Sequence, residues 1–145
     1  MRYMLLIYSN ENEIGRADPV HEKRTRDAHY AVIAEASRSS VFRSGEPLHP
    51  TFTATTVSVR AGRVLIADGP FAKTQQQLAG YYILECNNLD EAISWAAKIP
   101  TNCKGGGDGC IEIRPMLDIS NLTGDDEATE LQFDSSDDGR NDTIN

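Results

Sequence analysis

The chain has 145 residues, of which 39% are hydrophobic, and this suits one domain with a single core of ordinary size. Residues 1–115 carry 13 acidic and 13 basic side chains, so the whole net charge of −8 lies in the last 30 residues. A neutral body followed by an acidic tail gives no electrostatic basis for nucleic-acid binding, and no apolar run approaches the ~20 residues that span a bilayer. We therefore expect a cytoplasmic protein that does not bind membranes and whose first residues already form a strand.

The first third of the chain predicts a strand, a long helix and an extended segment. The continuous apolar run at 3–8 is typical of a central strand that is buried on both faces. Asp18 and Pro19 are a good N-cap and first residue for a helix, which we expect to run to about Ser40. Its packed face should carry Tyr30, Ile33, Ala34 and Ser37. Residues 41–50 predict a short extended segment, interrupted by glycine and proline.

The rest of the body predicts a hairpin, a strand, a helix and a last strand. Residues 51–60 and 63–68 alternate around an Ala-Gly turn, which is typical of a β-hairpin. A strand follows at 78–86. A helix is predicted at 89–98, begun by an Asn-x-x-Glu capping box and ended by a proline. Its buried residues should be Leu89, Ala92, Ile93, Ala96 and Ile99. Residues 110–115 alternate as the last strand.

This order of elements favours one fold class. Two right-handed halves with helices on one face of an antiparallel sheet give an α+β sandwich of the ferredoxin-like type. The other face of the sheet carries Val and Ile, so we expect a second copy to cover it and form a homodimer. The domain should span 1–116. Residues 117–145 are acidic and too poor in hydrophobic residues for a core, so we expect a disordered tail or a loosely docked one.

Four stretches resemble one family, the DGPF group of the YCII-related proteins. They are MRYMLLIY, ATTVSVRAGRVLIADGPFAKTQQQLAGYYILE, LDEAISWAAKIP and GCIEIRP, and they cover about residues 1–116. The resemblance implies a ferredoxin-like fold that forms a dimeric α/β barrel. The chain departs from the family pattern at Ala79, in the loop KGGGD and in the acidic tail.

The resemblance implies little about activity. Family members often lie in gene neighbourhoods with extracytoplasmic-function sigma factors, and their biochemical activity is generally unassigned. A His–Asp pair in a cleft is the basis for an enzymatic role in the wider group.

Asp68 and His49 are the candidate catalytic residues. Asp68 can start a turn in which its side chain accepts backbone N–H groups and Gly69 has positive φ, or it can act as a general base, and both roles can hold together. His49 lies in a Gly/Pro-rich extended stretch, where it is either the proton-transfer partner of Asp68 or an exposed loop residue. We expect His21 and His29 to be solvated on the polar part of the first helix.

Three further residues are candidates for substrate binding. Tyr81 and Tyr82 occupy opposite faces of one strand, so one belongs to the core or a dimer interface and the other can line a cavity, which we expect of Tyr81. Phe71 should close the edge of the core. Arg114 can bind an anionic ligand, but we favour an ion pair with Glu112 on the same strand face. No spacing typical of a metal site, a phosphate loop or a dinucleotide site is present, so no metal or cofactor is expected.

Three hypotheses for function follow. In the first, a cleft of the homodimer binds a small organic molecule and performs acid–base chemistry of an isomerase or lyase type. In the second, the protein is a non-enzymatic accessory of a regulatory partner such as a sigma factor, and the acidic tail docks on a basic surface. The third is a plain ligand-binding module.

Cys86, Cys103 and Cys110 should be reduced thiols, with a Cys103–Cys110 disulfide as the alternative.

Overall fold

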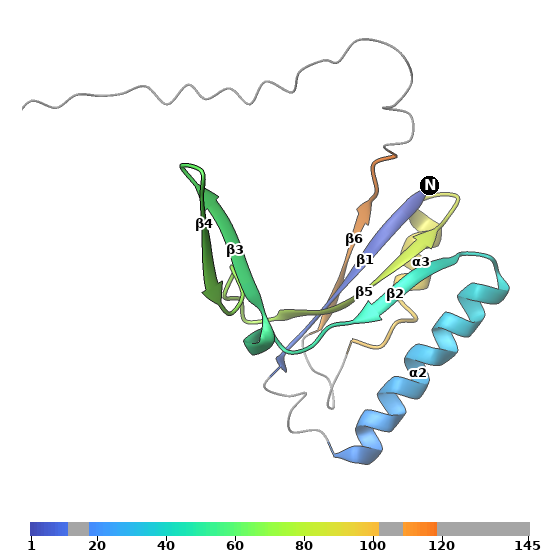
Figure 1. Cartoon of the computed structure of the whole chain (residues 1–145). Coiled ribbons are helices and arrows are strands. Elements are labelled where there is room, and N and C mark those ends of the chain that lie inside the picture. The colour runs from blue at the N-terminus through green and yellow to red at the C-terminus, as the bar shows by residue number, and fades with distance from the viewer. Residues whose placement is uncertain (12–17, 102–108, 119–145) are drawn as a thin grey trace, which may run out of the picture.

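Four strands form an antiparallel sheet in the order β2-β5-β1-β6, and two helices pack on one face of it (Figure 1). The computed structural model describes residues 1–11, 18–101 and 109–118. The strands of this sheet are β1 (Arg2–Ser9), β2 (Phe42–Pro47), β5 (Gln77–Glu85) and β6 (Cys110–Pro115). The helices are α2 (Pro19–Arg38) and α3 (Leu89–Ala96). The expected ferredoxin-like α+β fold is thus confirmed.

Strand β1 lies at the centre of the sheet and brings the core together. Tyr3, Leu5 and Ile7 alternate as buried residues on the helix face, and Leu5 is completely buried. Leu5 lies opposite Tyr82 on β5 and Ile113 on β6. The residues between them on β1 are only half-buried, because both helices cover the same face of the sheet. The prediction that both faces of β1 are buried is therefore wrong for the single chain.

Helix α2 begins as predicted, but of the four residues of its predicted packed face only Ile33 packs against the core. The Asp18 carboxylate accepts a hydrogen bond from the His21 amide at 2.9 Å, which caps the helix. The buried residues are Val32 and Ala36, whereas Tyr30 from the predicted face is 62% exposed. The predicted Ala34 and Ser37 are exposed as well. Alanines occur all around this helix, so its sequence marks the apolar face only weakly.

Helix α3 is shorter than predicted and packs through a bulkier residue. The Glu91 amide donates to Asn88 Oδ1 at 2.9 Å, so the predicted cap is formed. Ala92 and Trp95 are buried, whereas Leu89 and Ile93 are each 49% exposed. The predicted burial of these last two residues was therefore wrong.

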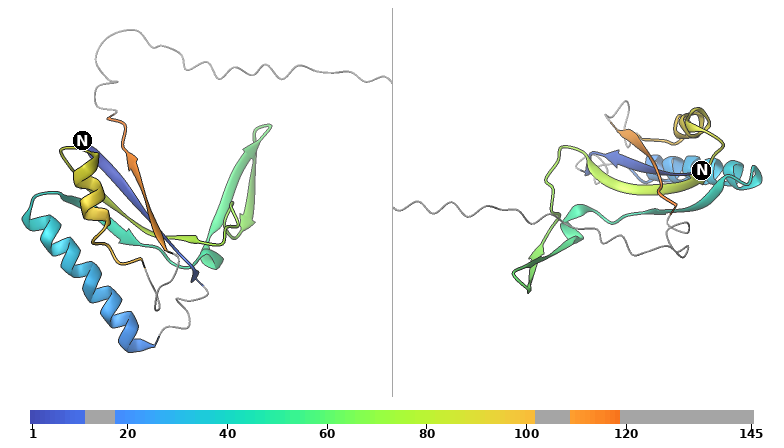
Figure 2. Two further views of the ribbon diagram at one scale, coloured as in Figure 1. Left: turned by 180° about the vertical axis from the view of Figure 1, so that it is seen from behind. Right: turned by 90° about the horizontal axis from the view of Figure 1, so that it is seen from above.

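The predicted hairpin forms but stands apart from the main sheet. Strands β3 (Thr55–Arg60) and β4 (Arg63–Asp68) make a separate two-stranded sheet that projects away from the body (Figures 1 and 2). Residues 42–47, which we expected only to be extended, supply the second strand of the ferredoxin-like unit instead. A short 3₁₀ turn at Thr51–Thr53 leads into the hairpin. No helix among the described residues is long and apolar enough to cross a membrane.

Candidate functional site: a cleft between helix α2 and the sheet

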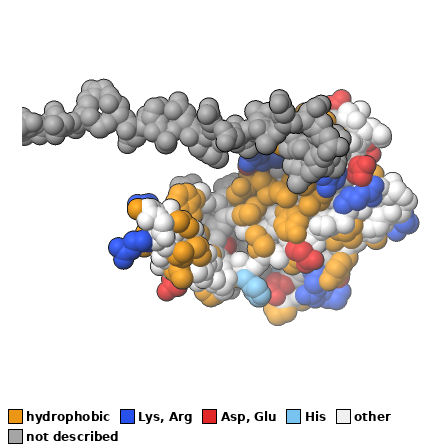
Figure 3. Space-filling model, turned by 45° about the horizontal axis from the view of Figure 1, so that its top comes forward, with side chains coloured by type: hydrophobic (Ala, Val, Ile, Leu, Met, Phe, Trp, Pro, Cys, Tyr) orange, Lys and Arg blue, Asp and Glu red, His pale blue; other side chains and the backbone are white. Residues whose placement is uncertain are grey.

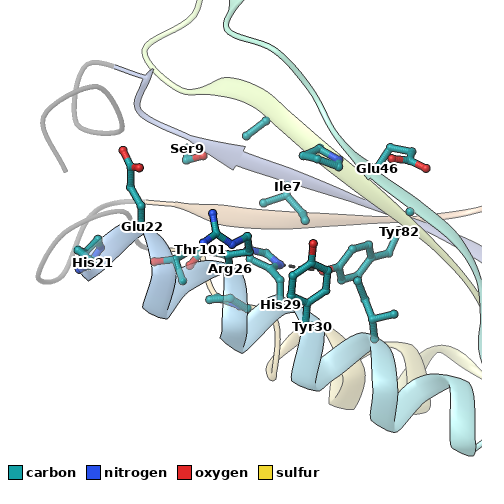
Figure 4. A pocket seen from close by; sticks show the side chains of 17 residues that line it. Ile7, Ser9, His21, Glu22, Arg26, His29, Tyr30, Glu46, Tyr82 and Thr101 are labelled. Carbon is teal, nitrogen blue, oxygen red and sulfur yellow. Dashed lines mark hydrogen bonds between the residues drawn. The ribbon is translucent and has the colours of Figure 1, made fainter. Parts of the chain in front are cut away.

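A cavity of about 580 Å³ lies between α2 and the sheet (Figure 4). One wall is α2, which contributes seven lining residues from His21 to Ile33. Strands β1, β2 and β5 form the opposite wall, and Pro100 and Thr101, which follow α3, complete the lining. Most of the wall is apolar, with a few polar groups pointing inward. This combination is typical of sites for small organic molecules.

Two glycines allow β2 and β5 to pair closely at the wall of this cavity. A Cβ atom on Gly45 would lie 2.3 Å from Tyr82 Cδ1 and 2.9 Å from the Tyr81 carbonyl oxygen. A Cβ atom on Gly80 would lie 2.8 Å from the Glu46 carbonyl oxygen. Gly45 therefore leaves room for the Tyr82 ring against β2, and Gly80 leaves room for the backbone of Glu46 and Pro47.

His29 and Tyr82 form the polar pair of the cleft. His29 Nδ1 and Tyr82 Oη are 2.8 Å apart and hydrogen bonded, and Figure 4 shows the imidazole of α2 meeting the phenol of β5. The Tyr82 ring also packs edge-on against Phe42, with ring centroids 5.9 Å apart. Tyr82 is buried and His29 is half-buried, so the contact joins the cavity to the core.

Burial sets the protonation of this pair. It lowers the pKa of His29 and raises the pKa of Tyr82 to about 12, because each charged form would lose solvation. At neutral pH the imidazole is therefore uncharged and the phenol keeps its proton. If Tyr82 donates to Nδ1, the imidazole proton lies on Nε2; if Nδ1 donates to Tyr82, Nε2 is a free base. Nε2 makes no hydrogen bond to any residue that the structure describes.

The predicted catalytic pair lies elsewhere. Asp68 and His49 are both exposed, neither lines the cavity, and no hydrogen bond or ion pair joins them within the described residues. Gly69 has φ of 92° and its amide donates to the Ala54 carbonyl at 2.7 Å, so the predicted turn with positive φ is confirmed. No described group donates to the Asp68 carboxylate, and its expected role as acceptor in this turn was wrong.

The three predicted binding residues also lie outside the cavity lining. Tyr81 faces the other side of the sheet, and it is Tyr82 that lines the cavity. Phe71 is 91% exposed because the chain leaves the hairpin after Pro70, so its expected place at the core edge was wrong. Arg114 is exposed and pairs with Glu112, with Nε and Oε1 3.7 Å apart, which confirms the favoured ion pair.

His21 and His29 of α2 do not lie where the sequence pattern predicted. Both line the cavity and both are half-buried, so the expectation that they are simply solvated was wrong. The sequence does indicate the inward position of His29. It lies three and seven residues before the buried Val32 and Ala36, and this spacing places all three on one helix face. His21 Nε2 is buried and has no hydrogen-bond partner in the described part of the chain.

Other predicted groups give no additional site. No cluster of three or more His, Cys, Asp or Glu residues that could hold a metal occurs within residues 1–11, 18–101 and 109–118. Cys86 is a buried free thiol and Cys110 an exposed one. Cys103, and with it the alternative disulfide, lies outside the described residues, as does nearly all of the acidic tail.

Comparison with known proteins places the chain in a family. The sequence profile of the YCII-related domain matches residues 1–120. An uncharacterized protein of Rhizobium meliloti (strain 1021) is 30% identical over 116 residues, which cover 80% of this chain and 92% of that protein. The match extends over the sheet, both helices, the hairpin and every described residue that lines the cleft. The chain therefore belongs to the YCII-related family.

Proposed function

We propose that the cleft between α2 and the sheet binds a small organic molecule, and that His29 and Tyr82 transfer a proton to or from it. The observation that carries this proposal is the 2.8 Å contact between His29 Nδ1 and Tyr82 Oη inside a cavity of about 580 Å³. A cavity of this size suits a compact metabolite. The reaction class is acid–base chemistry of the isomerase or lyase type.

The protonation states support this chemistry. A neutral imidazole can accept a proton at neutral pH, and the lowered pKa of His29 keeps it neutral there. The hydrogen bond to Tyr82 fixes the orientation of the ring, as the third group of a catalytic triad orients its histidine. In the tautomer in which Nδ1 donates to Tyr82, Nε2 is the free base that takes a proton from the ligand. The raised pKa of Tyr82 keeps its phenol an acid or hydrogen-bond donor throughout the neutral range.

Proton exchange in D₂O tests the proposal. The full chain is incubated with a panel of 2-oxo acids, 3-oxo acids and their esters, and loss of the acidic C–H signal is followed by proton NMR. We expect exchange that depends on the protein, that is lost in His29→Gln and that persists in the matched control His49→Gln. Exchange that survives in His29→Gln, or that disappears in His49→Gln, would contradict the proposal. Binding without exchange would leave only a ligand-binding module.

We also propose that two copies of the chain pair through the hairpin and the outer face of the sheet. Two directly opposed pairs, Val57 with Ile66 and Val59 with Val64, form one face of the hairpin and are 60–71% exposed. Figure 3 shows hydrophobic side chains on the hairpin and also on the body across a gap from it. Apolar patches of this kind on a soluble chain favour association.

The accessory role beside a sigma factor stays a prediction. It depends on residues 119–145, which the structure does not describe. Deletion of residues 117–145 followed by a pull-down of the partner is the direct test, and unchanged binding would exclude docking through the tail.

A further inference from the structure

If the proposed function holds, the side chain of Arg26 indicates which class of ligand the cleft binds. Arg26 lines the cavity and lies one helical turn before His29 and Tyr30 on α2. Figure 4 shows its side chain extending from the helix toward β1. Arg43 and Arg114 are held in ion pairs, whereas Arg26 makes no ion pair or hydrogen bond within the described residues.

Two carboxylates, those of Glu22 and Glu46, also line the cavity, and neither forms an ion pair with Arg26. Glu46 lies opposite Tyr81 in the register, whereas its neighbour Gly45 lies opposite Tyr82, so the Glu46 side chain belongs to the other face of the sheet. Glu22 lines the cavity from the first turn of α2, where the helix N-terminus favours a negative charge. It forms no ion pair with Arg26.

Arg26 is the one Lys or Arg among the described residues that line the cavity. Its neighbours across the cavity include Ile7 of β1 and Pro47 of β2, and Ile33 lies two turns further along α2. Arg26 is exposed, so it lies at the open edge of the cavity, next to an apolar wall. A cation in this position suits a ligand with one anionic group and an apolar body. The planar fork of a guanidinium matches a carboxylate with two parallel hydrogen bonds.

We propose that the ligand is a small organic acid whose carboxylate binds Arg26 and whose apolar body lies against Ile7, Ile33 and Pro47. A single guanidinium with Glu22 one turn away favours a monoanion over a phosphate dianion. Arg26 and His29 lie three residues apart on α2 and line the same cavity, so a ligand whose carboxylate binds Arg26 can extend toward the imidazole of His29. The carboxylate thus positions the rest of the ligand at the proton-transfer pair.

Matched acids and amides test this inference. Benzoate, benzamide, trans-cinnamate, trans-cinnamamide and phenyl phosphate are titrated into the ¹⁵N-labelled full chain, and the shifts of α2 and β5 resonances give the Kd values. We expect each carboxylate to bind about 10–100-fold more tightly than its amide, because a charge-assisted hydrogen bond is lost in the amide. Phenyl phosphate should bind more weakly than benzoate.

Three variants separate the role of Arg26 from general effects. Arg26→Gln should remove the preference for the acid, and Arg26→Lys should retain part of it, because the charge remains and the fork is lost. Arg24→Gln is the matched control: Arg24 is exposed on the same helix and does not line the cavity, so the preference should remain. Circular dichroism checks that each variant is folded.

The outcomes distinguish this inference from the proposed function. Equal binding of acids and amides in the cleft, or an unchanged preference in Arg26→Gln, would overturn the organic-acid inference and leave ligand binding in place. Tighter binding of phenyl phosphate than of benzoate would overturn the choice of carboxylate. If no compound shifts α2 or β5 resonances at millimolar concentration, both the inference and the proposed function fall.

Discussion

Removal of one hydroxyl group should weaken the pair at the centre of the cleft. Tyr82→Phe deletes the oxygen that lies 2.8 Å from His29 Nδ1 and leaves the ring against Phe42. A typical hydrogen bond contributes about 0.5–1.5 kcal/mol, and a buried partner left unsatisfied costs about 1–3 kcal/mol. Because His29 is only half-buried, water can replace part of the bond. We therefore expect a loss of about 1 kcal/mol, which corresponds to a fall in Tm of roughly 3–4 °C for a chain of this size.

The neighbouring tyrosine is a matched control for this substitution. Tyr81→Phe removes the same atom from the same strand, but Tyr81 lies on the other face of the sheet and forms no hydrogen bond through its side chain within the described residues. The change in the free energy of unfolding should stay within about 0.5 kcal/mol. The difference between the two variants then reports the contact with His29 rather than a general effect on β5.

Two measurements check the prediction. Thermal unfolding followed by circular dichroism gives the stability of both variants, and long-range ¹H–¹⁵N NMR spectra report the ring nitrogens of His29. Tyr82→Phe should shift the Nδ1 resonance, and Tyr81→Phe should not. Equal stability losses in the two variants, or an unchanged Nδ1 resonance in Tyr82→Phe, would refute the proposed contact.

Four further outcomes follow from the structure. Gly45→Ala places a Cβ atom 2.3 Å from Tyr82 Cδ1 and should cost roughly 1–3 kcal/mol, measured by urea unfolding; a neutral result would contradict the close packing. Because the pKa of His29 is lowered from 6.5, the unfolded chain takes up the proton first, so stability should be complete above pH 6.5 and decline below it. In His29→Gln this decline should become smaller, and an unchanged pH profile would contradict the assignment. Ile66→Glu should convert the proposed dimer to monomer in analytical ultracentrifugation, whereas a dimer that persists would exclude the hairpin face. Asp68→Asn should leave ligand Kd values in the cleft unchanged, because Asp68 does not line it.

The sequence predicted the elements that local chemistry determines. Asp18 with Pro19, the Asn88 cap and the positive φ of Gly69 each depend on a few neighbouring residues, and all were confirmed. Strand β2 was predicted only as an extended segment because it contains Gly45 and ends in a proline. Proline is tolerated in this position because β2 is at the edge of the sheet.

The candidate site could be predicted only in part, because it depends on which faces meet. Tyr81 and Tyr82 alternate on β5, and only the position of the helices decides which one is inward. Similarly, because alanines lie all around α2, its sequence does not decide which of two neighbouring faces packs on the sheet. The face that we predicted would place His29 in solvent, whereas His29 is half-buried. His49 and Asp68 were paired from residue type, but no contact among the described residues brings them together.

A crystal structure of the protein soaked with a mixture of small organic acids and their amides tests the central claim most directly. We predict electron density for an acid in the cleft, within hydrogen-bonding distance of His29 Nε2. An empty cleft after soaking, or a compound bound beside His49 or Asp68 instead, would contradict the proposal that His29 and Tyr82 form the functional site.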